Sequence, residues 1–280
     1  MAEITASAVV KLREMTGAGM MKCKEALVEA KGDFDLAVDI LRKRGVATAA
    51  RKGMREAREG IIVQHIQPGA RVGLLAEVNC ETDFVAKNDT FRAFGDEVAR
   101  KLAANPAADL EADRVAVVAK TGENVKVTRH TRLEVTGNGL VAAYIHTGAK
   151  IGVLVEVGAG KESTVANDEF KQLVRDITLQ IAAANPTTVS REQLDPAMLA
   201  KEREIAAEQV KNKPPQAIAK IVEGKLEKFY QTACLLDQGF VKKNSEISVK
   251  DHIAAIAKQL GDEVSVRRLV RFQVGEAATP

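Results

Sequence analysis

The residue pattern that most suggests a functional site is the run Cys80 to Lys87, where the acidic Asp83 stands beside the aromatic Phe84. The run follows an apolar, strand-like stretch, Val72 to Val78, and precedes a helical pattern that begins near Asp89. A Phe in such a short loop either folds back into its own core or projects toward another molecule. Projection leaves the ring in water and forgoes about 1.5–3 kcal/mol of burial, so it is the less common arrangement.

No pattern in the chain predicts catalysis. The phosphate-binding pattern G-x-x-x-x-G-K-[ST] fails at its nearest match, Gly160-Lys161, where Val155 replaces the first Gly and Glu162 replaces the Ser or Thr. Neither G-x-S-x-G nor H-E-x-x-H occurs. The four His have no metal-ligand spacing among themselves or with the three Cys. We therefore expect a binding or regulatory protein rather than an enzyme, with no cofactor and no metal.

Composition and charge indicate an ordinary globular protein. The 280 residues carry 41 basic and 38 acidic side chains, and the net charge of +3 is too small to indicate nucleic acid as the main partner. The three Cys are widely spaced and odd in number, which favours a reduced chain. The N-terminus lacks a signal-peptide pattern, and no apolar run has the length of a membrane span. We expect a cytoplasmic protein with no membrane partner and no direct nucleic-acid partner.

Residues 1–45 are expected to form a three-helix module. Thr5 to Glu14 predicts the first helix, and apolar residues recur at helical spacing from Met20 to Ala30 after a Gly-rich break. Asp33 is the expected N-cap of a third helix, and Gly45 is its expected C-cap. The apolar face of that helix is expected to consist of Leu36, Ile40 and Leu41.

Two features of this region each allow two interpretations. Met20 and Met21 could fill the small core, but neighbours on a helix diverge by 100°, so we expect one of them to be exposed. Because Met adapts well at binding surfaces, that residue is a candidate partner contact. The stretch Arg42 to Arg58 holds seven basic residues and one acidic residue. It is either a nucleic-acid patch or a solvated helical linker over 46–59, and the lack of interleaved aromatics favours the linker.

The central part of the chain contains an internal duplication. Residues 60–102 match residues 139–181 without a gap, with 11 identities over 43 aligned positions. Each copy has the pattern of a β-hairpin followed by a helix, and a third strand is expected further along. These patterns predict an α+β fold with two subdomains, 60–138 and 139–275, each a small antiparallel sheet covered by helices. The expected helices are Asp89–Ala103, Asp168–Ala183 and one near Val249–Leu260, and the expected third strands are Val125–Val135 and Val264–Val274.

The duplication also provides a control within one sequence. Phe84 aligns with Ser163, so the subdomain can fold without an aromatic at this position. This comparison favours a projecting, functional Phe84. In the same way, Gln67 occupies in copy one the hairpin turn that His146 occupies in copy two, so a His is not required there.

Residues 187–233 interrupt the second subdomain. Asp195-Pro196 predicts a helix start, and a second helix follows the break at Lys213 to Pro215. Two helices with a short connection form an antiparallel hairpin. The hairpin is expected either to pack on its own subdomain or to project as an arm for self-association or for a partner. The second helix is expected to present an apolar stripe of Ile218, Ile221, Val222, Leu226 and Phe229.

Two segments closely resemble the signatures of the bacterial elongation factor Ts family. The segments are Thr16 to Leu27, with its Thr-Gly-Ala-Gly-Met-Met start, and Glu77 to Lys87, which contains Thr-Asp-Phe-Val. The strand Ile151 to Val155 and the terminal Arg271 to Gly275 extend the resemblance over the whole chain. The resemblance implies a UBA-like N-terminal module and a guanine-nucleotide exchange factor of elongation factor Tu, the GTPase that delivers aminoacyl-tRNA to the ribosome.

The resemblance also implies contact residues and a mechanism. The loop of Thr82, Asp83, Phe84 and Val85 would enter the GTPase near its magnesium and phosphate sites, with Phe84 as the wedge. GDP would then be released and GTP could bind. The hairpin matches what the family uses for dimerisation, which implies a homodimer or a 2:2 complex. The other implied contact positions are Arg13, Met20, Met21, Lys24, Gly122 and His146.

The chain departs from longer members of the family at its end. Those members continue past the Arg-Phe-x-Val-Gly-Glu strand with a helix that contacts the partner, whereas only five residues follow Gly275 here, within a short tail over 276–280. We therefore expect that contact to be absent. The alternative function, from a different class, is an RNA-binding accessory protein of translation that uses Arg42 to Arg58.

Overall fold

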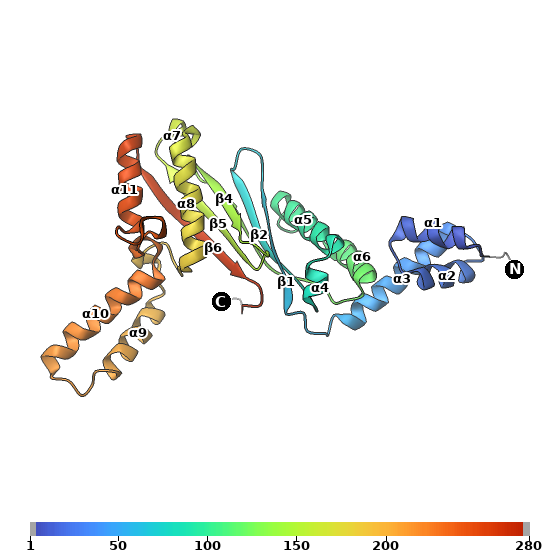
Figure 1. Ribbon diagram of the computed structural model, residues 1–280, viewed down its shortest axis with the longest axis horizontal. Helices are drawn as coiled ribbons and strands as arrows, with labels where there is room; N and C mark the ends of the chain where they lie inside the picture. Colours follow the sequence, from blue (N-terminus) through green and yellow to red (C-terminus); the bar gives the residue numbers. More distant parts are fainter. Residues whose placement is uncertain (1–3, 277–280) are drawn as a thin grey trace.

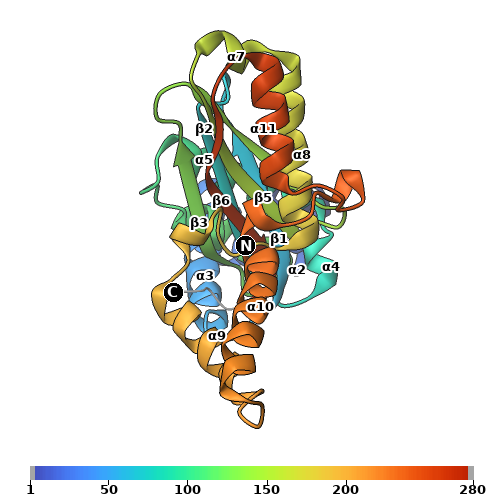
Figure 2. The same ribbon diagram turned by 90° about the vertical axis from the view of Figure 1, so that its left-hand side faces the viewer.

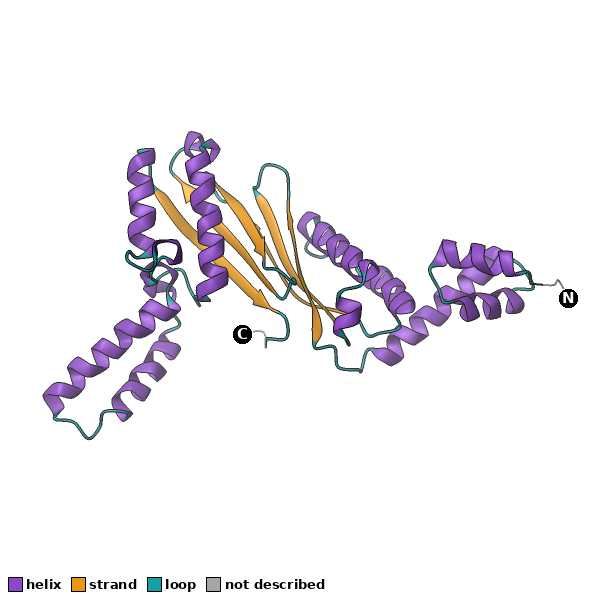
Figure 3. Cartoon of the chain, in the orientation of Figure 1, coloured by secondary structure: helices purple, strands orange, loops and turns teal. Residues whose placement is uncertain are grey.

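The computed structural model describes residues 4–276 and is elongated, with a helical module at one end, a helical arm at the other and two β-sheets between them (Figure 1). Within the described residues, strands occur only in the middle of the molecule (Figure 3). The predicted α+β class is therefore confirmed. Of the predicted tail, all residues but Glu276 lie outside the described part of the chain. No helix of residues 4–276 combines the length and the apolar character needed to cross a membrane.

The N-terminal module consists of α1 (Ala6–Thr16), α2 (Met20–Glu29) and the first part of α3 (Phe34–Lys52). The side chain of Thr5 caps α1, and the Asp33 carboxylate accepts the Leu36 N–H and caps α3, as predicted. These caps satisfy N–H groups that have no partner within the helix. A small core of buried residues from the three helices and the turns between them holds the module together: Val9, Leu12, Ala18, Cys23, Ala26, Leu27, Ala30 and Ala37.

Two predictions about α3 were wrong. Gly45 does not end the helix but lies buried at its middle, where α3 crosses α6 (Glu111–Thr121), a helix that was not predicted. A Cβ at Gly45 would lie 3.5 Å from Val115 Cγ1, which is an ordinary van der Waals distance, so Gly45 lies at the contact between the two helices. Leu36 is 48% exposed, because Ala37 and not Leu36 faces the module core. The predicted boundary at residue 45 thus falls inside one continuous helix.

Each subdomain contains a three-stranded antiparallel sheet with the second strand of its hairpin at the centre. The first sheet pairs β1 (Glu59–Ile66), β2 (Val72–Cys80) and β3 (Lys126–Glu134). The second sheet pairs β4 (Gly139–Ile145), β5 (Ile151–Ala159) and β6 (Val264–Gln273). Both ladders carry a register shift at the same aligned glutamate, after Glu77 and after Glu156, so the duplication predicted from the sequence extends to local irregularities.

Helices cover the sheets as predicted. The first subdomain buries α5 (Asp89–Ala104) on its sheet, and α8 (Asp168–Ala184) and α11 (Val249–Leu260) pack on the second (Figure 1). The side chains of Asn88 and Asn167 cap α5 and α8 at aligned positions. The aligned Phe91 and Phe170 are fully buried in the two cores.

The two sheets also pack against each other, which the sequence patterns did not predict. Buried residues of both sheets share one apolar cluster, which includes Leu75, Leu154 and Phe272. The approach is closest at two aligned glycines. A Cβ at Gly73 would lie 2.5 Å from Val141 Cγ1, and a Cβ at Gly152 would collide with the side chain of Ile62.

We expect Gly73→Ala to destabilise the fold by about 1–3 kcal/mol, because the added methyl group forces the two sheets apart. Gly224→Ala is the matched control. Gly224 lies within α10 (Pro215–Ala233), and a Cβ there meets nothing within 4 Å. Because alanine has a higher helix propensity than glycine, Gly224→Ala should stabilise the protein by about 0.5–1 kcal/mol. Urea denaturation of both variants checks the prediction, and equal stabilities would contradict the close packing at Gly73.

The inserted hairpin projects as an arm and does not lie along its own subdomain (Figures 1 and 2). Its role in self-association stays a prediction. Its helices are α9 (Pro196–Glu208), which starts where predicted and is capped by Asp195, and α10. The predicted apolar stripe faces α9, except that Phe229 packs near the base of the arm. At that base Arg191 bonds the carboxylates of Glu227 and Asp237 and lies over the Tyr230 ring, 4.3 Å from its centroid.

Candidate functional site

The segment that contains Phe84 is a single helical turn, α4 (Asp83–Ala86), rather than the loop that was predicted (Figure 1). The Thr82 hydroxyl accepts the Val85 N–H at 3.3 Å and caps the turn. Ala86 is buried and Val85 packs partly on the core of the first subdomain, so the turn is attached along one side. The Phe84 side chain points away from that core and is 81% exposed, as the comparison with Ser163 predicted.

The Asp83 carboxylate, next to Phe84, forms an ion pair. Lys87 Nζ lies 2.6 Å from Asp83 Oδ2. This hydrogen-bonded ion pair lowers the pKa of Asp83, so the carboxylate is ionised at neutral pH. The exposed face of α4 therefore presents one aromatic ring next to a partly neutralised carboxylate.

The structure brings Gly122 close to this turn. Gly122 is the left-handed C-cap of α6, with φ of 76°, and the next residue, Glu123, accepts hydrogen bonds from Glu81 and Thr82. Gly122 and residues 82–85 therefore belong to one surface, although about forty positions separate them in the chain. The predicted set did not include Glu123.

Four of the predicted contact residues lie on the N-terminal module instead. Arg13, Met20, Met21 and Lys24 are all exposed near the α1–α2 turn. Both methionines project from the core, with 38% and 67% exposure, although only one was expected to be exposed. A Cβ at Gly17 would lie 2.6 Å from Lys120 Cε, so the α1–α2 turn packs against the end of α6. The C-terminal end of α6 therefore contacts the N-terminal module and also carries Gly122.

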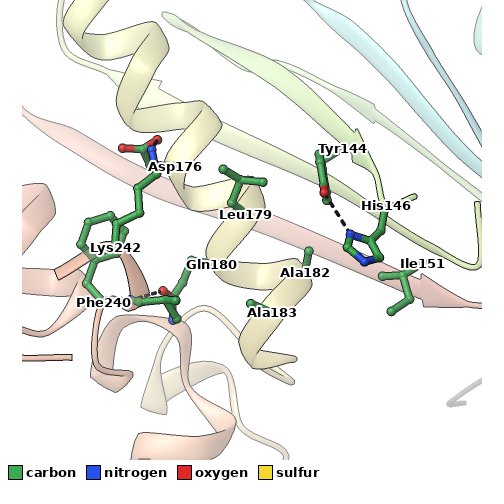
Figure 4. Close-up of a pocket in the computed structure, with 11 residues that line it drawn as sticks. Tyr144, His146, Ile151, Asp176, Leu179, Gln180, Ala182, Ala183, Phe240 and Lys242 are labelled. Carbon is green, nitrogen blue, oxygen red and sulfur yellow. Dashed lines mark hydrogen bonds and ion pairs between the residues drawn. The ribbon is translucent and has the colours of Figure 1, made fainter. Parts of the chain in front are cut away.

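His146 forms a third, separate part of the predicted set. It is exposed in the β4–β5 turn, and its Nδ1 lies 3.0 Å from the Tyr144 hydroxyl. It borders a mostly apolar cavity of about 300 Å³ between this turn and α8, where Leu179 and Phe240 contribute apolar surface (Figure 4). Lys242 and Asp176 form an ion pair of 2.6 Å at the rim. The cavity suits an apolar side chain of a partner better than a charged ligand.

The described residues show neither a metal-ligand cluster nor a reactive thiol at Cys80. Within residues 4–276 no group of three or more His, Cys, Asp or Glu side chains gathers as metal ligands would. The three Cys are buried. Burial, followed by the charge of Glu123, raises the pKa of Cys80 to about 12, so this thiol is protonated at neutral pH and is not a nucleophile.

Comparisons with known proteins agree on one family. Residues 81–276 match the family model described as "Elongation factor TS". The chain is 44% identical to the elongation factor Ts of Symbiobacterium thermophilum over 99% of this chain and 93% of that protein. The chain belongs to the elongation factor Ts family. Two further relatives have the same name. The one from Nitratidesulfovibrio vulgaris is 39% identical over 98% of this chain and 97% of that protein. The one from Nostoc sp. is 41% identical over 99% of this chain and 94% of that protein.

Membership in the elongation factor Ts family places the chain among translation elongation factors. The resemblance drawn from the two sequence segments is thereby confirmed. The family match begins at Glu81, two residues before the α4 turn, and covers the second subdomain and the arm. The full-length relatives extend the similarity over the N-terminal module as well.

Proposed function

We propose that this elongation factor Ts family protein binds elongation factor Tu in its GDP-bound form and accelerates GDP release. The observation that carries the proposal is the exposed Phe84 ring on a capped turn, which has no role in the core of its own subdomain. An aromatic held in this way becomes buried only when it enters another molecule. Its burial would then contribute to binding in the complex and not to folding.

The contact surface that we propose has three parts. The N-terminal module presents Arg13, Met20, Met21 and Lys24 to the GTPase domain. The α4 turn presents Thr82 to Val85, with Gly122 beside it. His146 and its cavity lie on the second subdomain. A rigid body that contacts its partner at three separate places can stabilise one conformation of that partner over another.

The mechanism follows from thermodynamic linkage. The factor must bind nucleotide-free elongation factor Tu more tightly than the GDP-bound form, and GDP must then weaken binding of the factor by the same ratio. Phe84 and the Asp83 carboxylate would disturb the magnesium and phosphate region of the GTPase. Mg²⁺ offsets phosphate charge, so displacing it leaves the phosphate oxygens less compensated and GDP dissociates faster. No catalytic group is needed on this chain.

Release of fluorescently labelled GDP from elongation factor Tu tests the proposal. Addition of the wild-type chain at substoichiometric concentration should accelerate release. Excess GDP should in turn weaken binding of the factor to elongation factor Tu, as linkage requires. An unchanged rate of GDP release would overturn the proposed function. The absence of competition between GDP and the factor would overturn the mechanism.

The alternative RNA-binding function has less support. Three of the seven basic residues between positions 42 and 58 are engaged with carboxylates. Arg44 pairs with Glu25 and Glu29, and Arg55 and Arg58 pair with acidic neighbours. Binding of RNA through the remaining charges would weaken steeply with salt, because counterions are released. We expect only weak RNA binding at 0.15 M salt in a filter-binding assay.

The arm supports a second proposal, which concerns self-association. Its helices contact each other rather than the sheets, and Met198 and Ile205 are partly exposed on α9. We propose that these exposed apolar residues support a homodimer or a 2:2 complex. Analytical ultracentrifugation of the wild-type chain and of Ile205→Lys distinguishes this from a monomeric arm, since only a dimer formed through α9 would be weakened by the charge.

A further inference from the structure

One carboxylate holds the turn that carries Phe84. Glu123 Oε2 accepts the backbone N–H groups of Glu81 and Thr82, both at 3.0 Å, and its Oε1 accepts the Thr82 hydroxyl at 2.6 Å. Hydrogen bonds to an ionised acceptor are shorter and stronger than neutral ones. Three of them converge on the residues that precede Asp83, so the start of α4 has little freedom to move.

The Glu81 carboxylate also joins the end of β2 to the loop after α6. Glu81 Oε1 accepts the Asn124 N–H at 2.7 Å, and Glu81 Oε2 lies 3.4 Å from Arg55 Nη1. Burial alone would raise the pKa of Glu81, but the Asn124 N–H and the Arg55 guanidinium together outweigh it and lower the pKa. Asn124 Nδ2 in turn donates to the Arg55 carbonyl at 2.7 Å. The end of β2 and the loop after α6 are thus joined reciprocally.

The second subdomain contains the same arrangement without an aromatic. Asp262, which aligns with Glu123 ahead of the third strand, accepts the Lys161 N–H at 2.9 Å and the Thr164 hydroxyl at 2.6 Å. It thereby holds α7 (Glu162–Ala166), the counterpart of α4, on which Ser163 stands in place of Phe84. The carboxylate is therefore a shared feature of both copies, whereas the aromatic ring is found only in the first.

We propose that Glu123 is a positioning residue for Phe84. By holding Thr82, it presets the direction in which the ring leaves the protein, so that less conformational freedom is lost when the ring enters a partner. Glu123 also follows Gly122 directly, so a contact at Gly122 and the orientation of the Phe84 ring are mechanically coupled. This inference rests on the proposed exchange function, and it assigns to Glu123 a role that Asp262 cannot have.

The pair Glu123→Ala and Asp262→Ala tests the inference. Both substitutions remove a carboxylate that caps an aligned turn, so their losses of folding stability should be similar. Only Glu123→Ala should reduce acceleration of GDP release, by about tenfold, the factor expected when charge-assisted hydrogen bonds that position a binding group are lost. Glu123→Gln, which keeps an acceptor oxygen, should recover part of the rate. Equal exchange rates for the two alanine variants would overturn the inference.

A measurement on the free protein separates this inference from the proposed function. The chain contains no Trp, so Phe84→Trp introduces a single fluorophore at the turn. Its fluorescence anisotropy should fall when Glu123→Gln or Glu123→Ala is added and should stay the same when Asp262→Ala is added. Unchanged anisotropy in the Glu123 variants would overturn the positioning role, whatever the exchange assay shows. A wild-type chain that fails to accelerate GDP release would instead overturn the proposed function.

Discussion

Replacing Phe84 with Ser will leave the folded protein as stable as the wild type and will remove most of its ability to accelerate GDP release. The ring is 81% exposed, so its loss costs little in folding, and surface substitutions usually change stability by less than about 0.5 kcal/mol. In a complex the same ring would be buried, which is worth about 1.5–3 kcal/mol. The rate of GDP release should therefore fall roughly 10- to 100-fold at a fixed concentration of the factor.

The duplication supplies the control for this experiment. In the double variant Phe84→Ser, Ser163→Phe the aromatic moves to the aligned turn of the second subdomain, and the composition is unchanged. We expect this variant to be folded and as inactive as Phe84→Ser, because α7 has the same carboxylate support but a different position on the molecule. Thermal denaturation and the GDP release assay check the two halves of the prediction. Full activity of Phe84→Ser would remove Phe84 from the proposed site.

Exposure of Phe84 could be predicted from sequence because the chain carries its own comparison. The aligned Ser163 showed that the position does not need an aromatic to fold, and the structure leaves the ring outside the core. The hairpins, the helix N-caps and the third strands were predictable for a related reason. They depend on local patterns that occur twice, so each copy supports the assignment of the other.

The features that could not be predicted depend on contacts between distant segments. Gly45 has the local appearance of a helix end, and only the structure shows that it lies buried within α3, in contact with Val115 of α6. Likewise no local sequence pattern marks Glu123, because its hydrogen-bond partners, Glu81 and Thr82, lie about forty positions earlier in the chain. The alignment of Glu123 with Asp262 is obscured in the sequence because the arm is inserted between the α8 helix and β6 in copy two alone.

Replacing Glu77 with Gln will destabilise the protein by about 3 kcal/mol, the lower end of the cost of breaking a buried ion pair. Glu77 is 1% exposed and its Oε2 lies 2.8 Å from Arg129 Nε. The Arg129 side chain is only 14% exposed, and its next carboxylate, on Glu276, is 4.0 Å away. Glutamine would keep acceptors for Asn79 and Gly275 but would leave the guanidinium buried without its close counter-charge.

The aligned substitution in the second sheet, Glu156→Gln, will destabilise the protein less than Glu77→Gln. Glu156 is equally buried, but its partners Arg267 and Arg268 are 32% and 46% exposed, so water can solvate them after Glu156→Gln. Urea denaturation should therefore rank Glu77→Gln below Glu156→Gln, with the exposed Glu134→Gln close to wild type. The reverse order would show that burial of the arginine does not set the cost.

This ranking also bears on how the proposed contact surface is held. Arg129 Nη2 donates to the Gln273 carbonyl at 2.9 Å, and Arg268 Nη2 donates to the Glu134 carbonyl at 2.5 Å, so each arginine reaches the third strand of the other sheet. The two glutamates therefore orient side chains that join the subdomains carrying Phe84 and His146. If Glu77 acts only through the stability of the fold, Glu77→Gln should reduce exchange only near its lowered unfolding temperature. A reduction at 25 °C, with the fold intact by circular dichroism, would mean that Glu77 also tunes the relative position of the two contact regions.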